Sequence, residues 1–149
     1  MIKYVSSFLT SEETEYFINL FQSGVKKFFG DQYYKYYYVD LMDTEIEVRK
    51  LDSFVFKKFR VQMVNETIQQ IEEPHTHLNS WSFIVFLNDD FEGGEIFFGE
   101  EVYTPKKGDM IYFSGEEYHR VNDCVGDRYT LIGFMLNNPF ELQIKKDFI

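Results

Sequence analysis

The histidines are the first residues in this sequence whose type and spacing suggest chemistry. The chain has only three, and two of them form the segment His75-Thr76-His77. Residues two apart on a strand project from the same face, so both imidazoles can point at one metal ion. The third, His119, follows 42 residues after His77. If the fold brings the two segments together, His75, His77 and His119 form a facial three-ligand metal site with open coordination positions. The alternative is a chance cluster of surface histidines.

A candidate receptor for an anion follows the third histidine. Arg128 lies nine residues after His119, and Thr130 comes two residues later. If segments 119–121 and 128–130 are neighbouring antiparallel strands joined by the turn 122–127, Arg128 lies deeper in the same cavity as the histidines, and Thr130 shares its face. A guanidinium offers two parallel donors and a hydroxyl adds a third, so this pair suits a carboxylate. The alternative is an ordinary surface ion pair with one of the 25 acidic residues.

The elements that must position these residues are mostly strands. Thr10 and Glu13 form a capping box, Phe17 and Phe21 belong to an apolar stripe, and Gly24 can end the helix that these signals predict. From residue 33 onward, strand-like segments alternate with turn sequences about every ten residues, which is typical of an antiparallel sandwich or barrel. The expected strands are 33–42, 54–64, 80–87, 95–98, 102–104, 110–113, 119–121 and 128–136. We therefore predict a mainly β fold, a double-stranded β-helix (jelly roll) with a short helical N-terminal part.

Composition limits the kinds of protein this can be. The 149 residues fit a single domain covering 1–149. An aromatic fraction of 19% excludes a disordered chain, and the absence of alanine beside abundant Phe, Tyr, Val, Ile and Thr favours strands. The formal net charge of −10 argues against nucleic acid or an anionic membrane surface as a partner.

The single cysteine and the apolar segments bear on the compartment. Cys124 cannot form an internal disulfide, and no apolar run approaches the roughly 20 residues of a membrane span. The first residues also lack the apolar stretch of a signal peptide, so a cytoplasmic location is expected. Because Asp123 and Asp127 oppose thiolate formation, Cys124 is predicted to be neither a metal ligand nor a nucleophile.

Six short motifs follow one another between residues 73 and 134. They are Pro74-His75-Thr76-His77, Leu87-Asn88, Gly93-Gly94-Glu95, Pro105-Lys106-Lys107-Gly108-Asp109, His119 and Gly126-Asp127-Arg128-Tyr129. Their order, and the spacing between the last histidine and the arginine, resemble the catalytic core of the iron(II)- and 2-oxoglutarate-dependent dioxygenases. The prolyl 4-hydroxylase-like branch is the most similar. More loosely, residues 8–21 resemble the opening helix of that family.

The resemblance implies a function for each candidate residue. His75 and His119 would bind Fe(II), and Arg128 would bind the distal carboxylate of the co-substrate 2-oxoglutarate with help from Thr130. The enzyme would use O2 to hydroxylate an unidentified small-molecule or peptide substrate, with prolyl residues of a protein as the family-level candidate. His77 stands where the family has Asp, so a site built from three neutral imidazoles would be more cationic. Strands 60–64 and 83–86 also lack the tyrosine that family members often place beside the co-substrate.

Three functions stay open at this stage. The first is the 2-oxoglutarate-dependent hydroxylase, and the second is a non-catalytic jelly-roll binding module descended from such an enzyme. The third is a cupin-type dioxygenase with three histidine ligands, which would not need Arg128. The cupin pattern includes a Glu shortly after His-x-His, and residues 78–81 do not supply one. The sequence specifies neither the substrate nor the oligomeric state.

Overall fold

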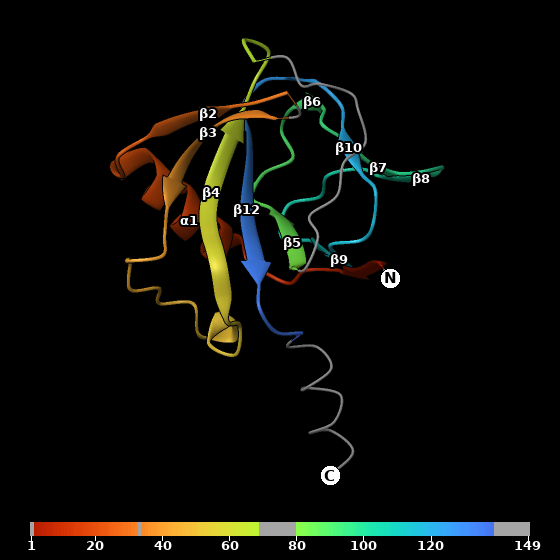
Figure 1. Cartoon of the computed structure of the whole chain (residues 1–149). Helices are drawn as coiled ribbons and strands as arrows, with labels where there is room; N and C mark the ends of the chain where they lie inside the picture. Colours follow the sequence, from red (N-terminus) through yellow and green to blue (C-terminus); the bar gives the residue numbers. More distant parts are fainter. Residues whose placement is uncertain (1, 33, 69–79, 139–149) are drawn as a thin grey trace.

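The computed structural model describes residues 2–32, 34–68 and 80–138 (Figure 1). One helix and one 3-10 turn accompany twelve strands in this part of the chain. In chain order they are β1 (Ile2–Val5), α1 (Ser11–Ser23), β2 (Lys27–Gly30), β3 (Lys35–Asp40), η1 (Arg49–Leu51), β4 (Phe56–Val64), β5 (Trp81–Phe86), β6 (Glu92–Gly93), β7 (Ile96–Phe98), β8 (Glu101–Tyr103), β9 (Met110–Ser114), β10 (Arg120–Val121), β11 (Cys124–Val125) and β12 (Arg128–Met135).

The strands form one large antiparallel sheet and two small ones. The large sheet has the order β1-β9-β5-β12-β4-β3-β2, and the small sheets have the orders β10-β7-β8 and β11-β6. Figure 1 shows α1 on one side of the large sheet and the β7, β8 and β10 strands on the other. This arrangement confirms the predicted mainly β jelly roll.

Each face of the large sheet has its own core. Along β12, Leu131 and Met135 join the cluster that contains Phe17 and Phe21 of α1. Ile132 points the other way, into a cluster with Ile96 and other residues inside the roll. The period-2 alternation of a strand therefore separates a helix-side core from a roll interior.

The helix follows the predicted capping signals. The backbone N–H of Glu13 donates to the Thr10 hydroxyl oxygen (3.2 Å), and the Glu13 carboxylate accepts from the Thr10 N–H (2.9 Å). At the other end, the Gly24 N–H donates to the Leu20 carbonyl. The capping box and the end of the helix are thus confirmed. Four strands were not predicted. β1 pairs with β9 at one edge of the large sheet, and β2, whose four residues are all exposed, lies at the other edge. The other two, β6 and β11, pair with each other in the two-stranded sheet.

The expected pairing of the His119 and Arg128 segments is wrong. β10 pairs with β7 in the three-stranded sheet, whereas β12 lies between β4 and β5 in the large sheet. The intervening residues form β11, in which Cys124 pairs with Gly93 of β6. A Cβ on Gly93, whose φ is +78°, would lie 2.2 Å from the Asp123 carbonyl oxygen, so glycine permits this close approach. The chain therefore crosses between sheets here and does not turn back as a hairpin.

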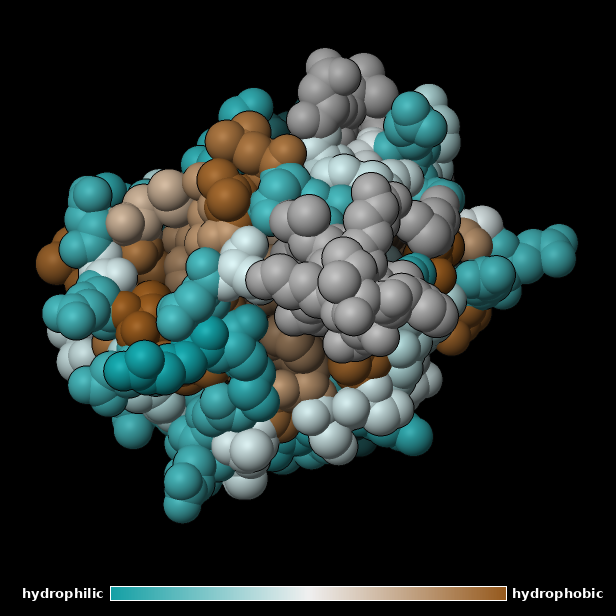
Figure 2. All heavy atoms as spheres, turned by 90° about the horizontal axis from the view of Figure 1, so that it is seen from below, coloured by the Kyte–Doolittle hydropathy of each residue, from teal (hydrophilic) through white to brown (hydrophobic). Residues whose placement is uncertain are grey.

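The surface mixes polar and apolar residues. Figure 2 shows hydrophilic and hydrophobic residues interspersed on the face seen from below. None of the helices in the described ranges is long and apolar enough to cross a membrane.

Candidate active site

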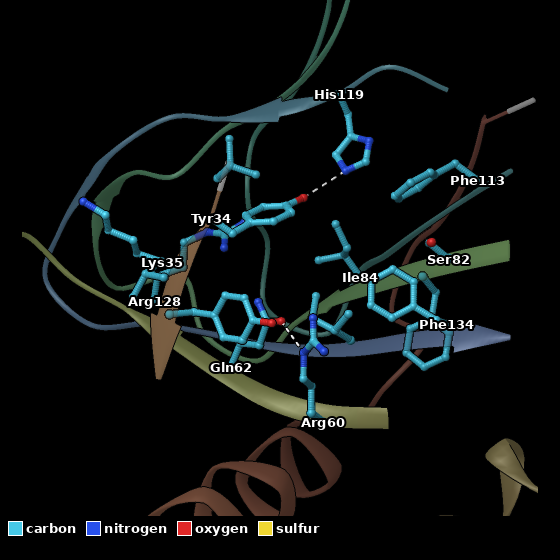
Figure 3. A pocket seen from close by; sticks show the side chains of 15 residues that line it. Tyr34, Lys35, Arg60, Gln62, Ser82, Ile84, Phe113, His119, Arg128 and Phe134 are labelled. Carbon is cyan, nitrogen blue, oxygen red and sulfur yellow. Dashed lines mark hydrogen bonds between the residues drawn. The ribbon is translucent and has the colours of Figure 1, made fainter. Parts of the chain in front are cut away.

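A small cavity lies inside the roll, between the large sheet and the β10 strand (Figure 3). Its volume is about 40 Å³, and both His119 and Arg128 line it. The two residues reach it from different sheets, because β10 and β12 do not pair. The structure thus brings His119 and Arg128 to one cavity, although not through the hairpin that the sequence predicted.

His119 is held in a defined orientation at the start of β10. Its side chain is buried, and its ring packs against Phe98 and Phe113 at centroid distances of 5.6 and 4.8 Å. Nδ1 lies 3.2 Å from the Glu117 carbonyl oxygen, and Nε2 lies 3.1 Å from the Tyr34 hydroxyl. Because a carbonyl can only accept, Nδ1 carries the proton and Nε2 keeps its lone pair. This is the tautomer that a metal ligand needs.

Tyr34 places a hydroxyl beside that lone pair. Burial raises the pKa of its phenol well above the ordinary value, so the group stays protonated at neutral pH and donates to Nε2 of His119. A metal ion lies about 2.0–2.1 Å from a ligating imidazole nitrogen. The Tyr34 hydroxyl occupies this lone pair in the structure, so it would have to turn away from Nε2 before His119 could hold an ion.

Arg128 is a buried cation at the start of β12. Its Nε and Nη2 atoms have no hydrogen-bond partner in the described part of the chain, and its guanidinium carbon lies 5.7 Å from the Phe86 ring centroid. Burial lowers its pKa to about 10, which Cys124 and Tyr34 partly oppose. A buried donor without an acceptor costs about 1–3 kcal/mol, and a bound carboxylate would remove this cost. The chemistry of this position therefore fits the distal carboxylate of 2-oxoglutarate.

Gly94 makes room for this guanidinium. Its φ is +72°, and a Cβ there would lie 2.7 Å from Cδ and 2.8 Å from Nε of Arg128. Any larger residue would press on the arginine, so the Gly-Gly pair of the motif shapes the site as well as the turn.

Thr130 is also buried and lies on the same face of β12 as Arg128 and Ile132. It pairs with Gln62 on β4 and with Phe86 on β5. Arg128 and Ile132, its neighbours on this face, line the cavity. The predicted face is therefore observed, whereas the contact of Thr130 with a co-substrate stays a prediction.

The other two histidines lie outside the described residues. His75 and His77 fall within 69–79, so the three-histidine ligand set, including His77 in place of Asp, stays a prediction. Within the described ranges, no group of three or more His, Cys, Asp or Glu side chains is placed to hold a metal ion.

Cys124 behaves as a buried structural thiol. Its Sγ lies 3.7 Å from the Val64 carbonyl oxygen and 3.6 Å from that of Gly126. Burial is the main cause that raises its pKa; the charge of Arg128 opposes this, and acidic residues such as Asp123 add to it. The net shift disfavours the thiolate, which supports the prediction that Cys124 is neither ligand nor nucleophile.

Sequence reasoning missed several polar residues of the cavity, among them Tyr34, Arg60 and Gln62. The Nε–H of Arg60 donates to Oε1 of Gln62 at 2.6 Å (Figure 3). A signal was present in the strand predicted over 54–64, because two polar residues alternate there with the buried Phe59 and Val61. Polar residues at the inward positions of a core strand indicate a lined cavity.

Comparisons with known proteins identify the family and the fold. Residues 56–136 match the family model described as the 2OG-Fe(II) oxygenase superfamily. A Pseudomonas putida prolyl-4-hydroxylase superimposes with a TM-score of 0.68 at 14% identity, covering 92% of each chain. A Trichoplax adhaerens prolyl hydroxylase, solved with a hypoxia inducible factor peptide, gives 0.68 at 14% identity over 95% of this chain and 86% of that one. The viral collagen prolyl hydroxylase of Paramecium Bursaria Chlorella virus-1 gives 0.60 at 16% identity over 89% and 93%. A search of curated protein sequences finds no significant match.

The match covers more than half of the chain, so the protein belongs to the 2OG-Fe(II) oxygenase superfamily. Its members are oxygenases that use Fe(II) and 2-oxoglutarate. The predicted family, the enzyme class and the two cofactors are therefore confirmed at this level.

Proposed function

We propose that the protein is an Fe(II)- and 2-oxoglutarate-dependent dioxygenase that hydroxylates a C–H bond of its substrate. His75, His77 and His119 hold the iron, and Arg128 binds the distal carboxylate of 2-oxoglutarate with help from Thr130. The observation that carries this proposal is the buried guanidinium of Arg128, with two unsatisfied N–H donors, in the same cavity as the acceptor nitrogen of His119.

The described residues prepare the site for this chemistry. When bound, ferrous iron and 2-oxoglutarate supply the oxidation: O2 converts the co-substrate to succinate and CO2, and the second oxygen atom enters the substrate C–H bond. Arg128 orients the co-substrate through a charge-assisted hydrogen bond, while His119 presents Nε2 because Nδ1 is held by Glu117. Phe113 and Ile132 line the same cavity and exclude water from it.

The finer assignments belong to the same proposal. Prolyl residues of a protein are one candidate substrate, since three similar structures are prolyl hydroxylases, and a small organic acid is the competing candidate. We further propose that the chain acts as a single domain over residues 1–149 in the cytoplasm.

The iron site is tested by anaerobic titration with Fe(II). Wild type should bind one ion, and His119→Ala should lose most of the affinity, whereas the control Tyr118→Ala changes an exposed neighbour and should bind like wild type. Binding should weaken as pH falls through the histidine range, because imidazole must be deprotonated to ligate. Unchanged affinity and stoichiometry in His119→Ala would contradict the ligand set.

Turnover is tested by succinate release under oxygen. Wild type should release succinate from 2-oxoglutarate slowly even without its substrate. His77→Asp lowers the charge of the site by one and should raise iron affinity or succinate release. Chelation of 2-oxoglutarate without any succinate, rescued by His77→Asp, would instead indicate a binding module descended from an enzyme. Iron binding without 2-oxoglutarate binding in either form would favour the cupin-type alternative.

A further inference from the structure

Arg60 is a second guanidinium that points into the cavity, from β4 (Figure 3). Aromatic rings surround it: its guanidinium carbon lies 4.7 Å from the Tyr36 centroid, 5.9 Å from that of Tyr38 and 5.3 Å from that of Phe134. Its Nε–H is taken by Gln62. The ion pairs found between described residues, Lys50–Glu13 and Lys107–Glu15, do not involve it. The Arg60 guanidinium therefore contacts neutral groups, through its Nε–H and through the neighbouring aromatic rings.

A groove outside the cavity leads to this arginine. Its volume is about 450 Å³, within the range of roughly 300–1,000 Å³ that small-molecule sites occupy. Tyr34, Tyr36, Arg60 and Phe134 line both the groove and the cavity. Arg60 thus lies where the groove meets the cavity, which is where a substrate would approach the reaction centre.

The position differs from the proposed co-substrate site. Arg60 pairs with Ile132, four residues along β12 from Arg128, which corresponds to about 13 Å along the strand. Burial lowers the pKa of Arg60, and it raises the pKa of the neighbouring Tyr36 phenol, which therefore stays neutral. Asp31 and Asp40 line the groove, but neither is within ion-pair distance of Arg60 in the described structure. The charge of Asp40 partly opposes the effect of burial on the pKa of Arg60, and Lys58 adds a second positive charge to the groove.

We propose that Arg60 binds the carboxylate of the primary substrate, and that this substrate is a small organic acid whose apolar body lies against Tyr36, Tyr38 and Phe134. The proposal rests on the proposed function, because it assumes that Arg128 takes the co-substrate. A guanidinium fixed by stacked rings and one hydrogen bond is pre-organised to receive a carboxylate on its remaining donors. The aromatic walls add contact area to the apolar part. A prolyl residue inside a protein offers no such carboxylate at this position.

A matched pair of probes tests this. We would measure binding of 3-phenylpropanoate and of its neutral amide to protein loaded with Fe(II) and saturating 2-oxoglutarate under argon. Wild type should bind the acid about 10- to 100-fold more tightly than the amide, as expected for one charged hydrogen-bonded contact. Arg60→Gln should remove this preference, and Arg60→Lys, which keeps the charge, should retain part of it. The melting temperature of each variant shows whether it is folded, and the comparison of acid with amide in wild type needs no variant.

Several results would overturn the inference. They are equal binding of acid and amide, no binding of the acid, a preference that survives Arg60→Gln, and competition between the acid and 2-oxoglutarate. Stimulation of succinate release by a proline-containing peptide but by no small acid would also overturn it. The affinity for 2-oxoglutarate separates the two proposals. If wild type binds 2-oxoglutarate but not the acid, the dioxygenase assignment survives and the substrate assignment does not, whereas failure to bind 2-oxoglutarate would contradict the dioxygenase assignment itself.

Discussion

The two faces of the large sheet are built from the same strands but serve different purposes. On β12, Leu131 and Met135 face α1 within a cluster of hydrophobic residues. The alternate positions, Arg128 and Thr130, are equally buried on the inner face but polar. Burying unpaired polar groups opposes folding, whereas burying apolar ones favours it. The helix-side face therefore mainly stabilises the fold. On the inner face, apolar positions such as Ile132 also stabilise it, whereas Arg128 gives up stability to keep a site ready for a ligand.

The largest effect on stability is expected on the helix side. Leu131→Ala should lower the free energy of unfolding by about 2–5 kcal/mol, because it leaves a cavity in a fully buried cluster. Urea denaturation measures this. The control is Val102→Ala on the half-exposed β8 position, which should change stability by less than about 0.5 kcal/mol. A loss below 1 kcal/mol for Leu131→Ala would show that this face does not carry the fold.

The opposite sign is expected on the inner face. Arg128→Met should raise the free energy of unfolding of the ligand-free protein by about 1–3 kcal/mol, because it removes a desolvated cation whose donors are unsatisfied. The same urea experiment measures it. Added 2-oxoglutarate should stabilise wild type and not the variant. If Arg128→Met destabilises the ligand-free protein, the arginine is a structural residue and the contrast between the faces fails.

A smaller effect is expected at alkaline pH. Burial raises the folded-state pKa of Tyr34, so its contribution to stability is complete below the unfolded-state pKa of about 10 and is lost as pH rises above it. Wild type should therefore lose up to about 1.4 kcal/mol per pH unit above pH 10 more than Tyr34→Phe. Denaturation at pH 9, 10 and 11 tests this, with Tyr118→Phe, which removes an exposed phenol, as the control. Identical slopes for wild type and Tyr34→Phe would place Tyr34 in contact with water.

Local signals in the sequence predicted the elements well. The Thr10 and Glu13 capping box gave the start of α1, and strand segments such as 128–136 lie within one or two residues of the observed strands. β1, β6 and β11 were missed, because these short strands obtain their hydrogen bonds from partners distant in sequence. β2 was also missed, although it pairs with the neighbouring β3, because its four exposed residues show no alternation of buried and exposed positions. Strand pairing also could not be predicted from the local sequence, because nothing within 119–130 shows that the chain crosses from one sheet to another.

The candidate site, like the fold, was predicted only in part. The order of the motifs correctly predicted that His119 and Arg128 line one cavity, although the hairpin expected to join them is absent. Tyr34 and Arg60 were missed, because their role depends on which strands face each other across the roll. A tyrosine was sought on the two strands nearest the metal motif, whereas the structure supplies one just before β3.

The central claim is that the inner face holds 2-oxoglutarate through Arg128. We would titrate 2-oxoglutarate into the Fe(II)-loaded protein under argon and follow the weak visible charge-transfer band of a ferrous 2-oxo acid chelate, in wild type and Arg128→Gln. The account predicts a saturable band in wild type and binding weakened by about 1.5–3 kcal/mol in Arg128→Gln, because a charge-assisted hydrogen bond is lost. Equal affinity in the two proteins, or no band in wild type, would contradict it.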